Sequence, residues 1–148
     1  MREILFRGQT RRVGEKVRMN GEKVPSNWAY GGICHGRGDF SIIYGDMDIK
    51  LENPIEKFVV YTDTVGQYTG LTDKNGTKIF EGDIVRGLFF HSRQKNSVVK
   101  FQDGTFGLEW DRGDIVMFWG FTNICNVEYE VIGNIYDHPE LLKGADDE

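Results

Sequence analysis

The chain of 148 residues contains only two cysteines and three prolines. Two cysteines are too few for a disulfide scaffold, and a chain of this length can bury a sizeable core without disulfide or metal staples. No apolar run approaches the ~20 residues of a membrane-spanning helix, and the N-terminal residues lack the apolar stretch of a signal peptide. These shortages predict a cytoplasmic protein with reduced thiols and no membrane association.

Signals for helices are scarce as well. Only Pro139 and Glu140 resemble a helix start, and such a helix would end by Leu142. Nineteen glycines and 13% aromatic residues are typical of short strands joined by tight turns. The composition therefore predicts a mainly β fold with few short helices.

Several runs match the strand pattern. Residues 40–44, 57–62, 79–85 and 128–136 are rich in β-branched and aromatic residues. The clearest hairpin joins residues 98–102 to 105–110 through Asp103-Gly104, a pair that tolerates the positive φ of a type I′ turn. Asn75-Gly76 has the same chemistry, so we expect a positive φ at Gly76.

Charge is distributed unevenly along the chain. Residues 1–37 carry eight basic and three acidic side chains, for a net charge of +5, whereas residues 71–148 carry eight basic and fourteen acidic ones, for −6. The basic end could serve a ligand or meet the acidic half of a neighbouring subunit. The total charge of −5 argues against general nucleic-acid binding.

The most distinctive motif is TGLTDKNGTKIFEGDIV at residues 69–85. It resembles the central signature of the YopX family, small proteins carried by phages and prophages. Residues 2–8, 28–31, 64–68 and 131–142 also match the family, so the resemblance spans almost the whole chain. The stretch from Gly8 to Trp28 and residues 89–96 and 111–126 depart from it. The resemblance implies a phage or prophage setting and no particular chemistry.

The order of the expected strands is similar to that of SH3-like barrels, in which a Gly-Asp-aliphatic-Val strand leads the domain. We expect an N-terminal β region with a basic loop over residues 1–66. Residues 67–148 would form a small SH3-like β-barrel, ending in a short helix, and the two regions could be one compact unit. This is an analogy of fold and carries no function by itself.

The candidate metal ligands have weak spacing. Cys34, His35, Cys125 and His138 lack the C-x₂₋₄-C and H-x₃₋₅-H patterns of zinc sites. The segment that begins at Asp73 has glycine fourth instead of sixth, unlike a calcium-binding EF-hand loop. We therefore expect no metal and no cofactor, and interpret the segment as a turn.

Catalytic patterns are weak too. Glu81 with Asp83, or Asp111 with Asp114, could pair as acid and base, but carboxylates beside turns are commonly solvated, and catalysis needs a cleft that separates their pKa values. The sequence has no nucleophile elbow, zinc-protease motif or phosphate-binding loop. We expect a protein that is not an enzyme.

Aromatic residues suggest two kinds of contact. Basic and aromatic residues in the first third could form a stacking surface for single-stranded nucleic acid, unless the aromatic side chains are packed; they are Arg11, Arg12, Trp28, Tyr30 and Arg37. A second group is too bulky for one small core, and aromatic residues are enriched in interfaces; it comprises Phe89, Phe90, Phe118, Trp119 and Phe121. We expect at least two of the second group to meet another subunit, unless a second layer of the same chain covers them.

The sequence thus predicts a phage- or prophage-associated accessory protein that acts by binding, as a homo-oligomer, in the host cytoplasm. Its partner would be a phage or host protein. Nucleic-acid binding through the basic N-terminal third is the alternative, and an enzyme is the third possibility.

Overall fold

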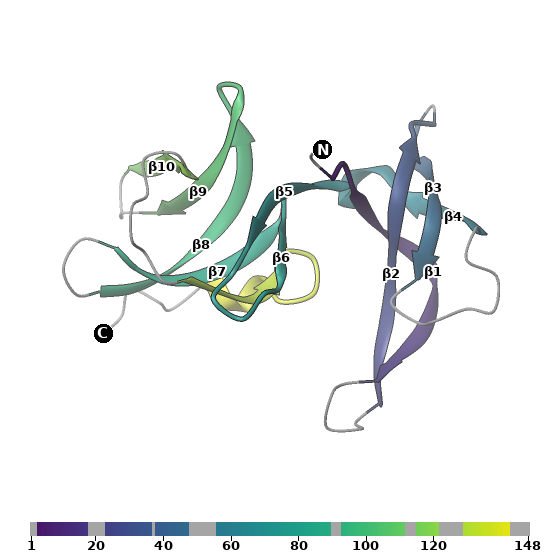
Figure 1. The fold of residues 1–148 in the computed structure, drawn as a ribbon, viewed down its shortest axis with the longest axis horizontal. Coiled ribbons are helices and arrows are strands. Elements are labelled where there is room, and N and C mark those ends of the chain that lie inside the picture. Colours follow the sequence, from purple (N-terminus) through teal and green to yellow (C-terminus); the bar gives the residue numbers. More distant parts are fainter. Residues whose placement is uncertain are drawn as a thin grey trace. The chain divides into compact units, whose positions relative to one another are not determined.

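The computed structural model of the protein describes residues 3–17, 23–36, 38–47, 56–89, 93–111, 115–121 and 129–142 (Figure 1). The chain divides into two compact units, residues 1–68 and residues 69–148. Strands make up most of both units and form two antiparallel sheets. The expectation of a mainly β fold is confirmed.

Eleven strands are described. They are β1 (Phe6–Val17), β2 (Lys23–Cys34), β3 (Phe40–Met47), β4 (Glu56–Tyr61), β5 (Gly66–Thr72), β6 (Lys78–Phe80), β7 (Asp83–Phe89), β8 (Arg93–Gln102), β9 (Thr105–Asp111), β10 (Val116–Gly120) and β11 (Tyr129–Asn134). The 3₁₀ turns η1 (Thr62–Thr64) and η3 (Pro139–Leu142) accompany them, so the helix expected at Pro139 is a 3₁₀ turn.

The first four strands form a ring of backbone pairings. β1 pairs with β2, β2 with β3, and β3 with β4, and β4 returns to β1 at Thr10↔Val60. Alternate side chains point into the ring, where Ala29, Ile43 and Val60 are fully buried. Half-buried apolar side chains pack against this cluster: Phe6, Ile33, Phe58 and Val65. The first unit thus has its own core.

The N-terminal basic segment is strand over most of its length. β1 and β2 together cover residues 6–17 and 23–34, and so include most of the stretch from Gly8 to Trp28 that departs from the family pattern. The register shifts between Gln9 and Gly14, which marks a bulge in β1. A bulge bends the strand and increases its local twist.

The second sheet has the strand order β10-β9-β8-β7-β11. Asp103 and Gly104 have φ values of 53° and 79°, which is the pattern of a type I′ turn, and they join β8 to β9 as expected. The last strand, β11, returns to pair with the first strand of the meander, β7. The core of the unit contains four fully or almost fully buried residues: Ile79, Val85, Val99 and Leu108.

Candidate functional site

The turn between β5 and β6, in the middle of the 69–85 motif, is built around Asp73. Its side chain is buried, with 7% exposed. Asp73 Oδ1 accepts hydrogen bonds from the backbone N–H groups of Asn75, at 2.8 Å, and Thr77, at 2.9 Å. Gly76 has a φ of 81°, as expected from the Asn-Gly pair. The segment is therefore a turn, as predicted, and the Asp73 carboxylate stabilises it.

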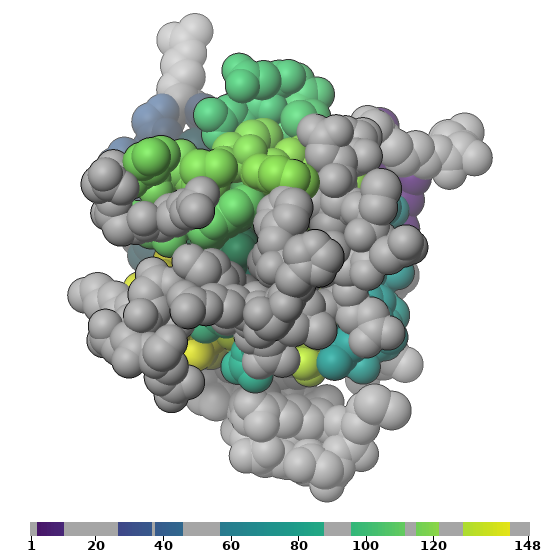
Figure 2. Space-filling model, turned by 90° about the vertical axis from the view of Figure 1, so that its left-hand side faces the viewer, coloured from purple at the N-terminus to yellow at the C-terminus, as the bar shows by residue number. Residues whose placement is uncertain are grey.

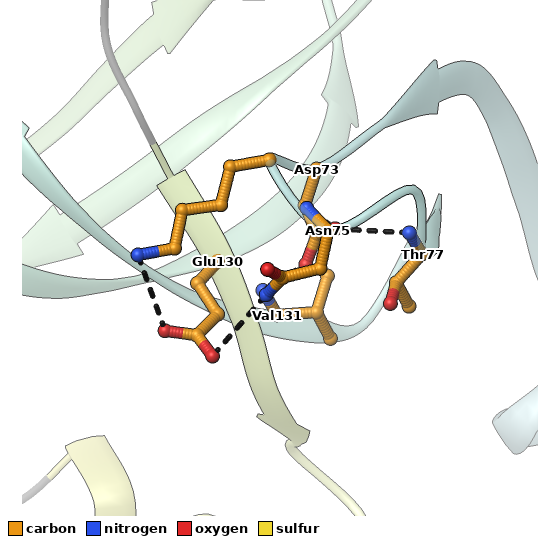
Figure 3. Close-up of polar contacts among 6 residues, drawn as sticks. Asp73, Asn75, Thr77, Glu130 and Val131 are labelled. Atoms are coloured by element: carbon orange, nitrogen blue, oxygen red, sulfur yellow. Dashed lines mark hydrogen bonds and ion pairs between the residues drawn. The ribbon is translucent and has the colours of Figure 1, made fainter. Parts of the chain in front are cut away.

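The same carboxylate also holds a strand that is far away in the sequence. Asp73 Oδ2 accepts a hydrogen bond from the backbone N–H of Val131 in β11, at 2.9 Å. The N–H of Lys74 donates to the carbonyl oxygen of Tyr129, at 3.1 Å. Figure 3 shows Asp73, Asn75 and Thr77 in the turn, facing Glu130 and Val131 on β11. Asp73 thus links the turn by a hydrogen bond to β11, the last strand of the second unit.

Exposed polar contacts surround this turn. Lys74 Nζ lies 3.8 Å from Glu130 Oε2, and the Asn75 side-chain amide lies 3.4 Å from Glu130 Oε1. Both ionic groups are more than 40% exposed, so solvent screens the pair and its net contribution is ~0–1 kcal/mol. The Asn75 side chain points toward Glu130, and both Asp73 oxygens accept hydrogen bonds from backbone N–H groups. This arrangement stabilises the backbone of the turn rather than binding a cation.

A second buried carboxylate, Asp83, organises the next bend. Only 2% of the residue is exposed, and Asp83 Oδ2 accepts the backbone N–H of Phe80 at 2.8 Å. Gly82, at a φ of 87°, donates to the Val99 carbonyl and accepts from Ile135 N–H, both at 2.9 Å. Asp83 therefore supports a bend where three chain segments meet.

The metal-ligand candidates are dispersed between the units. Cys34 and His35 are exposed in the first unit, and His138 lies in the second, where its Nδ1 accepts the N–H of Asn134 at 3.3 Å. Cys125 and Asp114 lie outside the described residues. Within the described part of the chain, no group of three or more His, Cys, Asp or Glu side chains could hold a metal ion.

Three of the five predicted interface residues lie on or directly after β10. Phe118 and Trp119 lie on opposite faces of β10, and Phe121 follows this strand. All three are half-buried: the Trp119 ring lies 6.4 Å from Trp110, and Phe121 lies 5.9 Å from Tyr129. Of the other two, Phe89 ends β7 with a side chain outside the described set, and Phe90 lies outside the described residues. The sequence reasoning missed Ile115 and Val116, which are 55% and 63% exposed beside these aromatics.

The predicted nucleic-acid contacts lie mostly on β1 and β2. Trp28 is only 6% exposed, and the Arg7 guanidinium lies 4.7 Å from the centre of its ring. Such a cation–π contact covers the ring face, and Tyr30 is half-buried. Arg11 and Arg12 belong to β1, but their side chains, like the whole of Arg37, lie outside the described set. Sequence reasoning missed Arg7, since only the pairing of β1 with β2 brings it onto Trp28.

The Tyr129 phenol belongs to β11, beside the turn at Asp73. Burial raises the pKa of Tyr129 above its ordinary value of 10.0. The unfolded chain therefore loses this proton first, so the contribution of Tyr129 to stability is constant below about pH 10 and falls as the pH rises through the raised pKa.

We expect a Tyr129→Phe variant to lose a component of the tyrosine titration that lies above pH 10.0, followed by ultraviolet absorbance from about pH 8 to about pH 12. Its stability should also fall less steeply above pH 10 than that of the unaltered chain. A difference titration centred on 10.0 would contradict the burial of this phenol.

Taken together, the strands and buried carboxylates define a small two-unit β protein whose buried polar side chains hold backbone turns. A family model described as YopX protein matches residues 17–143. The chain belongs to the YopX family.

Two known proteins are similar to the chain. The SPbeta prophage-derived uncharacterized protein YopX of Bacillus subtilis (strain 168) is 33% identical over 101 residues, which span 58% of this chain and 73% of that protein. The crystal structure of protein EF1440 from Enterococcus faecalis aligns with 97% of this chain and 100% of its own, at 23% identity and a TM-score of 0.46. Among the described residues, no helix has the length and apolar character to cross a membrane.

Proposed function

We propose that this YopX-family protein is a phage- or prophage-associated accessory protein that acts by binding and self-assembly in the host cytoplasm, without catalysis of its own. The prophage origin of the Bacillus subtilis relative supports the setting. The partner beyond a second copy would be a phage or host protein.

The observation that carries this proposal is the exposure of apolar side chains on strands of both sheets. Tyr44 and Val59 in the first sheet are 47% and 54% exposed, and Phe101 and Val116 in the second are 54% and 63% exposed. Ile115 and Val116 are consecutive and both exposed, and contiguous exposed apolar residues mark interaction surfaces. The buried carboxylates of Asp73 and Asp83, in contrast, accept backbone N–H groups, which favours a structural role over acid–base chemistry.

We further propose that the second unit is an SH3-like barrel. The meander β7-β8-β9-β10, with β11 returning to β7, is consistent with that topology. The proposal concerns the fold, and barrels of this size serve many functions.

Sedimentation velocity and native mass spectrometry of the full chain test the proposed self-assembly. We expect a mass above that of the 17.0 kDa monomer that rises with protein concentration, because the exposed apolar surface is modest. A monomer at every concentration up to the millimolar range would overturn the proposal. A pull-down from infected cells with the tagged full chain would then identify any other partner.

The nucleic-acid alternative makes a different prediction. If the basic N-terminal segment contacts phosphates, the logarithm of the affinity for duplex DNA falls with log salt at about −0.9 per contact. We expect no such binding. An Arg11→Glu, Arg12→Glu variant should differ from the unaltered chain in the mass of its oligomer or not at all. Salt-dependent DNA or RNA binding that the double variant loses, with unchanged mass, would establish the alternative.

A further inference from the structure

Strand β10 lies at the edge of the second sheet. Among the described residues it pairs with β9 alone. Residues 115–120, IVMFWG, contain no charged residue and no proline. Natural edge strands are usually protected by lysine, proline or a covering element, because an open edge is a template for another strand. Figure 2 shows the green segment that includes β10 at the surface of the second unit.

The register shows which backbone groups of β10 point away from the sheet. The type I′ turn at Asp103-Gly104 makes Gln102↔Thr105 a hydrogen-bonded pair. Hydrogen-bonded and non-hydrogen-bonded pairs alternate along an antiparallel ladder. Every second residue of β9, counted from Thr105, therefore bonds to β8. Leu108 and Trp110 lie between those residues, so their N–H and C=O groups point toward β10.

The partners of these two residues on β10 are Trp119 and Met117. The backbone groups of Val116 and Phe118 therefore point outward, away from β9. The Gly82 N–H···O=C Val99 bond agrees with this assignment, because it requires Val99 of β8 to point away from β9.

The burial of individual β10 residues limits which part of the edge another strand can reach. Gly120 is buried, whereas Ile115 and Val116 are 55% and 63% exposed. Phe118 and Trp119 are half-buried. The accessible edge thus has exposed aliphatic side chains at its beginning and partly covered aromatic side chains toward its end.

We propose that β10 pairs antiparallel with β10 of a second copy of this chain, about a two-fold axis at Met117. This inference rests on the proposed self-assembly and names the surface responsible for it. Val116 of each copy would pair with Phe118 of the other through about four backbone hydrogen bonds in total. Met117 would face its own equivalent, and Ile115 would lie beside Trp119 of the second copy.

The edge is complementary to itself, which favours a second copy over an unrelated strand. An antiparallel arrangement places the aliphatic beginning of one strand against the aromatic end of the other, at both ends of the interface. No like charges meet within the paired segment. An axis at Phe118 would instead require Val116 to pair with the buried Gly120. The interface is small, below ~1,200 Å², so we expect a dimer that dissociates on dilution.

Cysteine cross-linking tests the register. In a Cys34→Ser, Cys125→Ser background, Met117→Cys should form an intermolecular disulfide on mild oxidation, because facing residues of a non-hydrogen-bonded pair lie ~4.5 Å apart at Cα, within disulfide reach. In the proposed register, Val116→Cys and Phe118→Cys each lie diagonally from their equivalents, at ~7–8 Å, and should cross-link poorly. Preferential cross-linking at 116 or 118 would overturn the proposed axis.

A charge at the edge tests the surface itself. Val116→Lys should weaken dimerisation about tenfold or more, because each copy would lose an aliphatic contact and would have to desolvate an ammonium group at the pairing edge. The new lysine lies opposite Asp111 of its own β9, so the monomer should keep its circular dichroism and melting temperature. Ile4→Lys adds the same charge at an aliphatic side chain of the first unit that is also 63% exposed; it is the matched control and should leave the dimer intact.

The outcomes separate the two proposals. A protein that is monomeric at all concentrations overturns both the self-assembly and the β10 pairing. A dimer that Val116→Lys leaves unchanged, and that none of the three cysteine variants cross-links, keeps self-assembly but overturns the pairing through β10. A monomeric chain whose β10 variants lose binding to a captured phage or host protein assigns the edge to that protein and also overturns the proposal.

Discussion

Replacing Asp73 with alanine is expected to lower the free energy of unfolding by about 4 kcal/mol. The buried carboxylate accepts three backbone N–H groups, from Asn75, Thr77 and Val131, at 2.8–2.9 Å. A hydrogen bond to a charged group contributes ~1.5–3 kcal/mol, and the alanine variant leaves its donors without their acceptor. The three contributions are not additive, since water can enter the turn.

Urea unfolding followed by tryptophan fluorescence measures this loss. Asp73→Asn should fall between alanine and the unaltered chain, because one amide oxygen can still accept from the turn while the amide nitrogen faces the Val131 N–H. Glu130→Gln, which changes only the exposed ion pair with Lys74, is the control and should cost less than ~1 kcal/mol. An Asp73→Ala variant as stable as Glu130→Gln would show that the turn does not hold β11.

Replacing Gly31 with alanine is expected to destabilise the first unit by about 3 kcal/mol or more. Gly31 pairs with Gly45 of β3 and with Phe6 of β1. A Cβ at Gly31 would overlap the carbonyl oxygen of Tyr44, and would lie 2.6 Å from that carbonyl carbon and 3.0 Å from Gly45 Cα. These atoms belong to backbone, so β2 and β3 would have to move apart.

The neighbouring glycine provides a matched control. A Cβ at Gly32 would meet nothing within 4 Å, and this residue is exposed on the same strand. Gly32→Ala should therefore be neutral or stabilise by up to ~1 kcal/mol, because alanine reduces the freedom of the unfolded chain. Equal urea midpoints for the two variants would contradict the close approach of β2 and β3.

The first unit shows where sequence reasoning reached its limit. Trp28 and Arg11 suggested a stacking surface because aromatic and basic residues alternate in the sequence, yet Trp28 is buried beneath Arg7. The partner of a strand residue depends on register, and register is set by pairing across tens of residues. No local pattern marks Arg7 as the residue that covers this ring.

The second unit shows the same limit at its edge. The aromatic group predicted to form an interface includes Phe118 and Trp119, which lie together on β10, but composition could not show that β10 is an edge strand. That position depends on β11 returning to β7 and not to β10. The exposed pair Ile115 and Val116 therefore emerged only from the sheet order.

By itself, the sequence determined the family, the mainly β class and the two tight turns at Asn75-Gly76 and Asp103-Gly104. These follow from local chemistry, since each turn needs residues that tolerate positive φ, and strand residues show their alternation within a few positions. Only the tertiary structure decided that Asp73 holds Val131, 58 residues away, and that β10 lies at an edge. A buried carboxylate and an edge strand are both defined by what packs against them or pairs with them, and that depends on contacts between segments distant in the chain.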